Sequence, residues 1–157
     1  TASLIENEKP YAIRYDISNK LKFCALIPDF KTSTHEARKI LPKTIDFQDA
    51  VFNLSRVAVL LKALETGDME MIRIALKDKL HQQYRGSLIH EWDEVKAICV
   101  KGGSQAIFIS GSGPTIMNIT KDERFPVRIK EGMSRLKHNW EIKMLETDNT
   151  GAKVEIL

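Results

Sequence analysis

Glycine and serine alternate between two apolar segments in the sequence ISGSGPTIM, residues 109–117. Glycine allows the positive φ angles of tight turns, and it lets a backbone approach a ligand because it has no Cβ. A hairpin turn between two strands would explain these glycines by itself. The N–H groups and hydroxyls of such a loop would also suit a phosphate. The sequence therefore supports two interpretations, a plain turn or an anion-binding loop formed by Ser110, Gly111, Ser112 and Gly113.

A second candidate is the sequence STHEARKILP, which predicts a short helix with a capping box between Ser33 and Glu36 and a stop at Pro42. Thr34 would take the first helical position, where its hydroxyl and the unsatisfied backbone N–H groups face outward. Arg38 follows four residues later, on the same face of the helix. Both side chains could therefore bind one anionic molecule. The alternative is that Thr34 assists capping and Arg38 pairs with a surface carboxylate.

Arg85 is the third candidate, in the sequence DKLHQQYRGSLI, where an amphipathic segment ends directly before a glycine. Side chains at such a helix–loop junction often point into clefts. Arg85 and Arg38 lie on separate predicted elements, so together they could bind a carboxylate. We interpret the neighbouring Asp78, Lys79 and His81 as a solvated face with local ion pairs, and His81 as structural rather than a base.

Other chemistries find less support in the sequence. The histidines and cysteines show no spacing typical of a metal site, so we predict none within this chain. The glycine loop is not the G-x-S-x-G elbow of the α/β-hydrolases, which argues against a Ser-His-Asp hydrolase. Cys24 and Cys99 are far apart and indicate no disulfide framework, so we expect a reducing, cytoplasmic setting.

The composition is that of one soluble globular domain covering residues 1–157. A net charge of +3 is too small to mark a nucleic-acid binder, although it is compatible with a small anionic ligand. No apolar run is long enough to cross a bilayer, so no membrane partner is predicted. The first residue is not methionine, and we expect the chain to be part of a longer protein.

The apolar patterns predict the elements that position these candidates. Strands are predicted at 11–17 and 22–28 as a hairpin, and at 105–110, 115–120, 140–148 and 153–157; helices are predicted at 33–41, 46–65, 69–85, 89–102 and 125–139. The helix at 46–65 shows an apolar stripe that we expect to face the core: Phe47, Ala50, Val51, Leu54, Val57, Ala58 and Leu61. The predicted fold is an α+β two-layer sandwich, with an antiparallel sheet and helices on one face in a ferredoxin-like arrangement.

Taken together, the segments LIPDFKTSTHEARKILP, DAVFNLSR, DKLHQQYRGSLI and ISGSGPTIM resemble the second half of the homoserine kinases, a family of the GHMP small-molecule kinases. The resemblance covers nearly the whole chain, and the glycine loop resembles the third signature motif of the superfamily. Gln83 and His90 depart from the pattern, because many relatives have proline at these positions. The loop near Arg85 is therefore expected to be less rigid.

The resemblance implies an ATP-dependent kinase that phosphorylates L-homoserine to O-phospho-L-homoserine in threonine biosynthesis. It implies that Arg38 and Arg85 bind the carboxylate of the amino acid, that Thr34 lies near the transferred phosphoryl group, and that the loop from Ser110 to Gly113 approaches the phosphates. The superfamily's phosphate-binding loop and its Mg²⁺ ligands are not found in these residues. We therefore expect ATP and Mg²⁺ to be held mainly by an N-terminal kinase domain, and this chain alone to be inactive.

Two other functions remain open at this stage. The same arginines would serve a free-standing amino-acid-binding or regulatory module without catalysis. An RNA-binding sandwich would need stacking aromatic residues on an exposed sheet face, and aromatic residues make up only 7% of the chain. An apolar surface left exposed by the absent half would also favour a homodimer.

Overall fold

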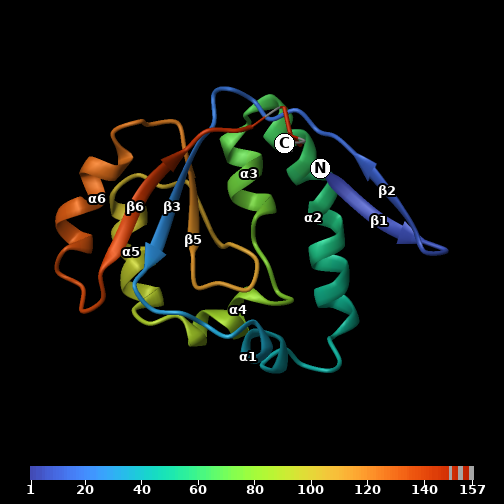
Figure 1. Cartoon of the computed structure of the whole chain (residues 1–157), viewed down its shortest axis with the longest axis horizontal. Coiled ribbons are helices and arrows are strands. Elements are labelled where there is room, and N and C mark those ends of the chain that lie inside the picture. The colour runs from blue at the N-terminus through green and yellow to red at the C-terminus, as the bar shows by residue number, and fades with distance from the viewer. Residues whose placement is uncertain (149, 152–153, 156–157) are drawn as a thin grey trace.

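The centre of the molecule is a four-stranded antiparallel sheet in the order β4-β5-β3-β6 (Figure 1). The computed structural model describes all residues except 149, 152–153 and 156–157. The bounds of the sheet strands are β3 (Lys22–Pro28), β4 (Ala106–Ile109), β5 (Ile116–Thr120) and β6 (Trp140–Leu145). β3 pairs with both β5 and β6, with Ala25 opposite Met117 on one side and Lys143 on the other. The predicted central position of KFCALIP is therefore confirmed.

Two helices cover one face of this sheet, α5 (Trp92–Lys101) and α6 (Phe125–Met133). Cys24 and Leu26 on β3 are fully buried there, against Val95 of α5 and Ile129 of α6. Burying such an apolar side chain contributes about 1.5–3 kcal/mol, which explains why the apolar strand runs face these helices. The predicted α+β class, an antiparallel sheet with helices packed on it, is confirmed.

A second core cluster uses the strand side chains that alternate with the first. Phe23 and Ile119 pack there with residues of α2 (Phe47–Thr66) and α3 (Met69–Ala75), including Ala63 and the fully buried Ile72. Because neighbouring strand side chains point to opposite faces, helices pack on both faces of the sheet, whereas the sequence predicted them on one face. Asp46 caps α2 by accepting from Gln48 N at 2.7 Å, and a left-handed Gly67 ends the helix.

The predicted hairpin between residues 11–17 and 22–28 is wrong. The first strands are β1 (Ala2–Glu6) and β2 (Lys9–Ile13), which pair only with each other and project away from the sheet beside α2 (Figure 1). Side chains on both faces of this hairpin are exposed, including 75% of Ile5 and 62% of Ile13. An alternating pattern predicts a strand but not its partner, because pairing depends on long-range register.

The predicted helix at 69–85 is also wrong, because the chain leaves helical geometry after Ala75. It resumes in α4 (Gln82–Arg85), which continues into a short 3₁₀ turn at Gly86–Leu88. The intervening residues are held by polar contacts with α2, described below, which compete with helical hydrogen bonds. A continuous apolar period cannot reveal such an interruption.

The apolar stripe expected to bury α2 is largely on the surface. Phe47 is 82% exposed and Leu54 is 75% exposed, and Val51 and Val57 are about half exposed. A periodic stripe shows that a helix has an apolar face, but it does not show what covers that face. Exposed apolar side chains on one helix face are typical of surfaces that bind another protein.

Several other elements lie where the sequence predicted them. α1 (Thr34–Lys39) and β4, β5, α5, α6 and β6 lie within the ranges predicted for them. Most of the predicted last strand, 153–157, lies outside the described residues. Within the described part of the chain, no helix combines the length and the apolar character needed to cross a membrane.

Candidate functional site

The short helix α1 begins as the sequence predicted. Ser33 is the N-cap, and its hydroxyl accepts from Glu36 N at 3.5 Å. Thr34 is the first helical residue and is exposed, so its hydroxyl faces solvent. Arg38 is exposed as well, and among the described residues no carboxylate pairs with it. The surface ion pair considered for Arg38 is therefore not formed within this part of the chain.

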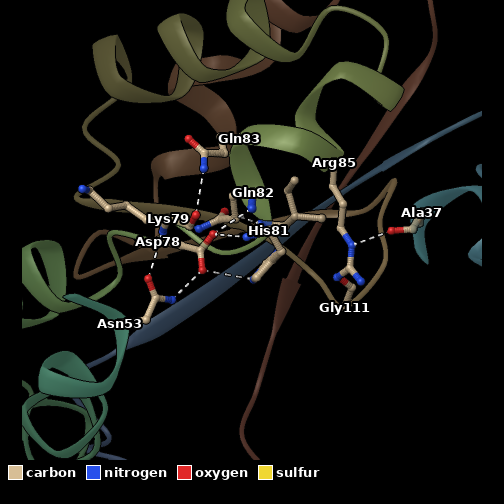
Figure 2. Close-up of polar contacts among 10 residues, drawn as sticks. Ala37, Asn53, Asp78, Lys79, His81, Gln82, Gln83, Arg85 and Gly111 are labelled. Atoms are coloured by element: carbon tan, nitrogen blue, oxygen red, sulfur yellow. Dashed lines mark hydrogen bonds and ion pairs between the residues drawn. The ribbon is translucent and has the colours of Figure 1, made fainter. Parts of the chain in front are cut away.

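Arg85, the last residue of α4, joins two segments that are distant in sequence (Figure 2). Its Nε donates to the carbonyl of Ala37 in α1 at 3.1 Å, and its Nη1 donates to the carbonyl of Gly111 at 2.9 Å. Nη2 makes no hydrogen bond to any residue that the structure describes. A guanidinium has five N–H donors, so donors remain for a ligand at the junction of α1, α4 and the glycine loop.

The glycine loop is a hairpin turn between β4 and β5. Ser110 N donates to Thr115 O at 2.9 Å, and Gly113 N donates to Ser110 O at 3.0 Å, which closes the loop. Gly111 and Gly113 have φ angles of +58° and +83°, which favour glycine. A Cβ built on Gly111 would meet no atom within 4 Å, so this backbone is bare and open to solvent. The turn interpretation is confirmed, and the geometry also leaves room for a ligand.

The Asp78 side chain is only 8% exposed, contrary to the predicted solvated face, whereas Lys79 is exposed and forms an ion pair with Asp49 at 2.7 Å, as predicted. The Asp78 carboxylate accepts from His81 N at 2.8 Å, from Gln82 N at 2.7 Å and from Asn53 Nδ2 at 2.7 Å. Burial by itself would raise the pKa of Asp78, but these hydrogen bonds outweigh it and lower the pKa. The carboxylate therefore stays ionised and caps the first turn of α4.

Two further contacts complete this network, which Figure 2 shows from α2 to the glycine loop. Asn53 Oδ1 accepts from Lys79 N at 3.0 Å, so Asn53 contacts the segment before α4. Gln82 contacts the strand that leads into the glycine loop, because its Oε1 accepts from Ile109 N at 3.0 Å, at the end of β4.

A pocket of about 180 Å³ lies beside the network, lined by Asn53, Asp78 and Gln82 together with apolar residues of α2 and β4. Arg38, Arg85 and the glycine loop do not line it.

The described residues contain no cluster of three or more histidine, cysteine or acidic side chains that would hold a metal ion. At the Arg85 junction, the N–H groups of the guanidinium that are not bonded to Ala37 or Gly111 suit an anionic ligand.

Sequence reasoning found Arg85, the glycine loop and α1, but it missed the roles of Asp78 and Gln82. Asp78 lies four residues before the first residue of α4, whose N-cap is His81, so it is outside the position where a cap is expected. Its role was also hidden by the apparent continuity of the helical pattern through this segment. Nothing in the local sequence indicates that Gln82 contacts a strand 27 residues later.

Comparisons with known proteins fit this geometry. The family described as "GHMP kinases C terminal" matches residues 60–139, slightly more than half of the chain. A homoserine kinase of Clostridium botulinum (strain Kyoto / Type A2) is 45% identical over 156 residues, which are 98% of this chain and 52% of that protein. A homoserine kinase of Caldicellulosiruptor saccharolyticus is 39% identical over 156 residues, 97% of this chain and 51% of that protein.

A solved structure shows the same fold. The crystal structure of homoserine kinase from Cytophaga hutchinsonii superposes with a TM-score of 0.80 at 24% identity, covering 86% of this chain and 44% of that one. The chain spans about half the length of the curated relatives that it matches. On the match to residues 60–139, this chain belongs to the GHMP kinases and corresponds to their C-terminal domain.

Proposed function

We propose that this chain is the C-terminal half of a homoserine kinase, which uses ATP to phosphorylate L-homoserine. The observation that carries the proposal is the guanidinium of Arg85, held between Ala37 of α1 and Gly111 of the glycine loop. The junction joins the three segments that the sequence singled out. The names of the curated relatives support homoserine as the substrate.

In this proposal, Arg38 and Arg85 bind the carboxylate of homoserine. Arg38 is exposed on α1, one residue after the Ala37 carbonyl that Arg85 contacts, so both arginines belong to one region of the surface. Two guanidinium groups suit a carboxylate because each offers paired N–H donors. Thr34 lies one turn before Arg38, and its hydroxyl is the group that we place near the transferred phosphoryl.

The reaction is a phosphoryl transfer. The side-chain hydroxyl oxygen of homoserine bonds to the γ-phosphorus of ATP while the bond to the ADP oxygen breaks. Catalysis of this kind depends mainly on positioning and on stabilising charge, so the bare backbone at Gly111 and the exposed Ser110 hydroxyl would approach the phosphates. The described residues do not fit a Mg²⁺ site, and none of these roles depends on a metal bound to this chain.

An N-terminal kinase domain is the partner that we propose for the exposed apolar surface. This surface comprises residues of the β1–β2 hairpin and of α2: Leu4, Ile5, Tyr11, Ile13, Phe47, Val51, Leu54 and Val57. The relatives are about twice as long as this chain, which leaves a segment of matching size to cover it. We place the ATP-binding loop and the Mg²⁺ ligands in that domain, and the whole protein in the cytoplasm.

The test uses a joined enzyme, in which the preceding half of the Clostridium botulinum homoserine kinase is fused to Thr1 of this chain. A coupled assay of ADP release should show turnover that depends on homoserine. The chain alone should show none, because it is proposed to hold half of the active site. A joined enzyme that folds but releases no ADP with homoserine would overturn the proposal, whereas tight homoserine binding by the chain alone, without turnover in the joined enzyme, would indicate a regulatory module.

A further inference from the structure

Asp78 has the features of a residue that sets the position of α4. Its carboxylate accepts from two successive backbone N–H groups, those of His81 and Gln82, and from the amide of Asn53 in α2. The side chain is 8% exposed, so water competes little for these contacts. Since α4 is only four residues long, loss of the cap would free the helix that carries Arg85.

Gln82 ties the same helix to the other side of the junction. Its Oε1 accepts from Ile109 N at 3.0 Å, and this residue ends β4 directly before the glycine loop. Ile109 is 3% exposed, so its N–H would have no ready replacement partner if Gln82 were lost. Gln82 thus ties α4 to the strand directly before the glycine loop, in addition to the bond between Arg85 and Gly111.

Arg85 connects α4 both to α1 and to the glycine loop. It lies three residues after Gln82, at the other end of α4, and reaches both Ala37 O and Gly111 O (Figure 2). The hydrogen bond to Gly111 O requires α4 close to the glycine loop, and the one to Ala37 O requires α4 close to α1. The donors of Arg85 that remain for a ligand are therefore oriented through Asp78 and Gln82.

We propose that Asp78 and Gln82 are positioning residues for Arg85: Asp78 caps α4, and Gln82 couples α4 to the glycine loop. Neither residue needs to touch the substrate. The inference rests on the proposed function, because it assigns the two residues to the binding of homoserine. It extends that proposal to residues that act only through another side chain.

The experiment compares matched variants of the joined enzyme. Gln82→Met keeps the length of the side chain and removes the acceptor for Ile109 N, whereas Gln82→Glu keeps an acceptor at that position. Asp78→Asn keeps the shape but replaces one acceptor oxygen with a donor group. Asp93→Asn is the control, because the Asp93 side chain is 89% exposed and lies on α5.

Two readouts separate positioning from general stability. The first is the pair of dissociation constants for homoserine and for ATP. The second is the Nε–H cross-peak of Arg85 in ¹H–¹⁵N spectra of arginine-labelled enzyme, identified by its loss in Arg85→Lys. This N–H donates to Ala37 O, so its protection from exchange with water reports the position of Arg85 without reference to any substrate.

We expect Gln82→Met and Asp78→Asn to weaken homoserine binding about tenfold or more, to change ATP binding less than about twofold, and to abolish protection of the Arg85 N–H. Gln82→Glu should keep most of the affinity, and Asp93→Asn should change nothing. Should Asp78→Asn fail to fold, the Gln82 pair decides. An unchanged Arg85 cross-peak, or parallel losses for homoserine and ATP, would overturn the inference. If the parent does not bind homoserine, the proposed function fails and the cross-peak alone decides whether Arg85 is positioned in this way.

Discussion

Arg85 Nη1 lies 2.9 Å from the carbonyl oxygen of Gly111, which comes 26 residues later in the chain. The Nε of the same guanidinium donates to Ala37 O, 48 residues earlier. One side chain therefore joins α1, α4 and the glycine loop. A ligand held by Arg85 would lie beside the open backbone of Gly111, which leads to the predictions below.

The two arginines should differ in their effect on stability. We expect Arg85→Ala to lower the free energy of unfolding of the chain by about 1–3 kcal/mol, because two carbonyls lose a charged donor. Arg38→Ala should change it by less than about 0.5 kcal/mol, because Arg38 is exposed. In the joined enzyme, each variant should raise KM for homoserine about 100-fold and leave KM for ATP nearly unchanged. Urea unfolding and steady-state kinetics check the two halves of this prediction, which is contradicted if both variants keep the parent KM.

Adding a side chain to the glycine loop should lower enzyme activity as well as strain the backbone. Gly111→Ala meets no neighbouring atom, but its φ of +58° costs about 1–2 kcal/mol. Gly103→Ala is the matched control, with a φ of +98° and open space around its Cβ, in the turn after α5 rather than in the glycine loop. Both should destabilise the chain similarly in thermal unfolding. Only Gly111→Ala should lower kcat of the joined enzyme, by about tenfold or more; equal activity of the two variants would mean that the loop is only a turn.

Because of Asp78, the free energy of unfolding of the chain should fall at acid pH. Its pKa is lowered in the folded chain from the ordinary value of 3.8, so its ionised form stabilises the fold. This contribution is fully present above pH 3.8 and is lost as the pH falls below 3.8 through the folded pKa. Urea unfolding from pH 7 to pH 3 should show a steeper acid loss for the parent than for Asp78→Asn. Identical pH profiles would show that the carboxylate charge adds no stability.

The two cysteines should report unfolding. Burial raises the pKa of Cys24 to about 11 and that of Cys99 to about 12, and both side chains are fully buried. At pH 8 the reactive thiolate is thus about 100- to 1000-fold rarer than for an ordinary thiol. We expect no labelling by iodoacetamide in the native chain and labelling of both thiols in urea, as measured by mass. Rapid native labelling would contradict the buried positions.

The exposed apolar side chains on α2 should contribute to binding of another protein rather than to the stability of the chain. Leu54 is 75% exposed, so Leu54→Lys should leave the thermal midpoint of the chain nearly unchanged. The same change should weaken binding of a separately expressed N-terminal half about tenfold or more, because it places a charge in an apolar interface. Light scattering should also show less self-association of the chain. Ala58→Lys, on the exposed part of the same helix, tests how far the surface extends.

The local rules of the sequence predicted the parts of this fold that depend on near neighbours. Ser33 caps α1, as its position indicated, and the helix predicted at 46–65 is α2, which ends at Gly67. The glycines between two strand patterns form the predicted turn between β4 and β5. These features succeed because a cap or a turn is formed by residues within four or five positions of one another.

The same local rules could not predict which strands pair or which segments pack against one another. The hairpin expected at residues 11–28 forms instead between β1 and β2, and the helix expected at 69–85 is interrupted where Asn53 contacts Asp78 and Lys79. The stripe on α2 faces outward although its period is helical. In each case the deciding contact joins distant segments, and apolar periodicity carries no information about them.

The sequence by itself determined an α+β chain with two arginines and a glycine loop fit to bind an anion. Only the tertiary structure decided that Arg85 lies between Ala37 and Gly111, that Asp78 accepts from the first N–H groups of α4, and that Gln82 contacts Ile109. The physical reason is that a side-chain hydrogen bond requires its two partners within about 3 Å. Packing of the whole sheet and its helices sets that distance, and no spacing along the chain encodes it.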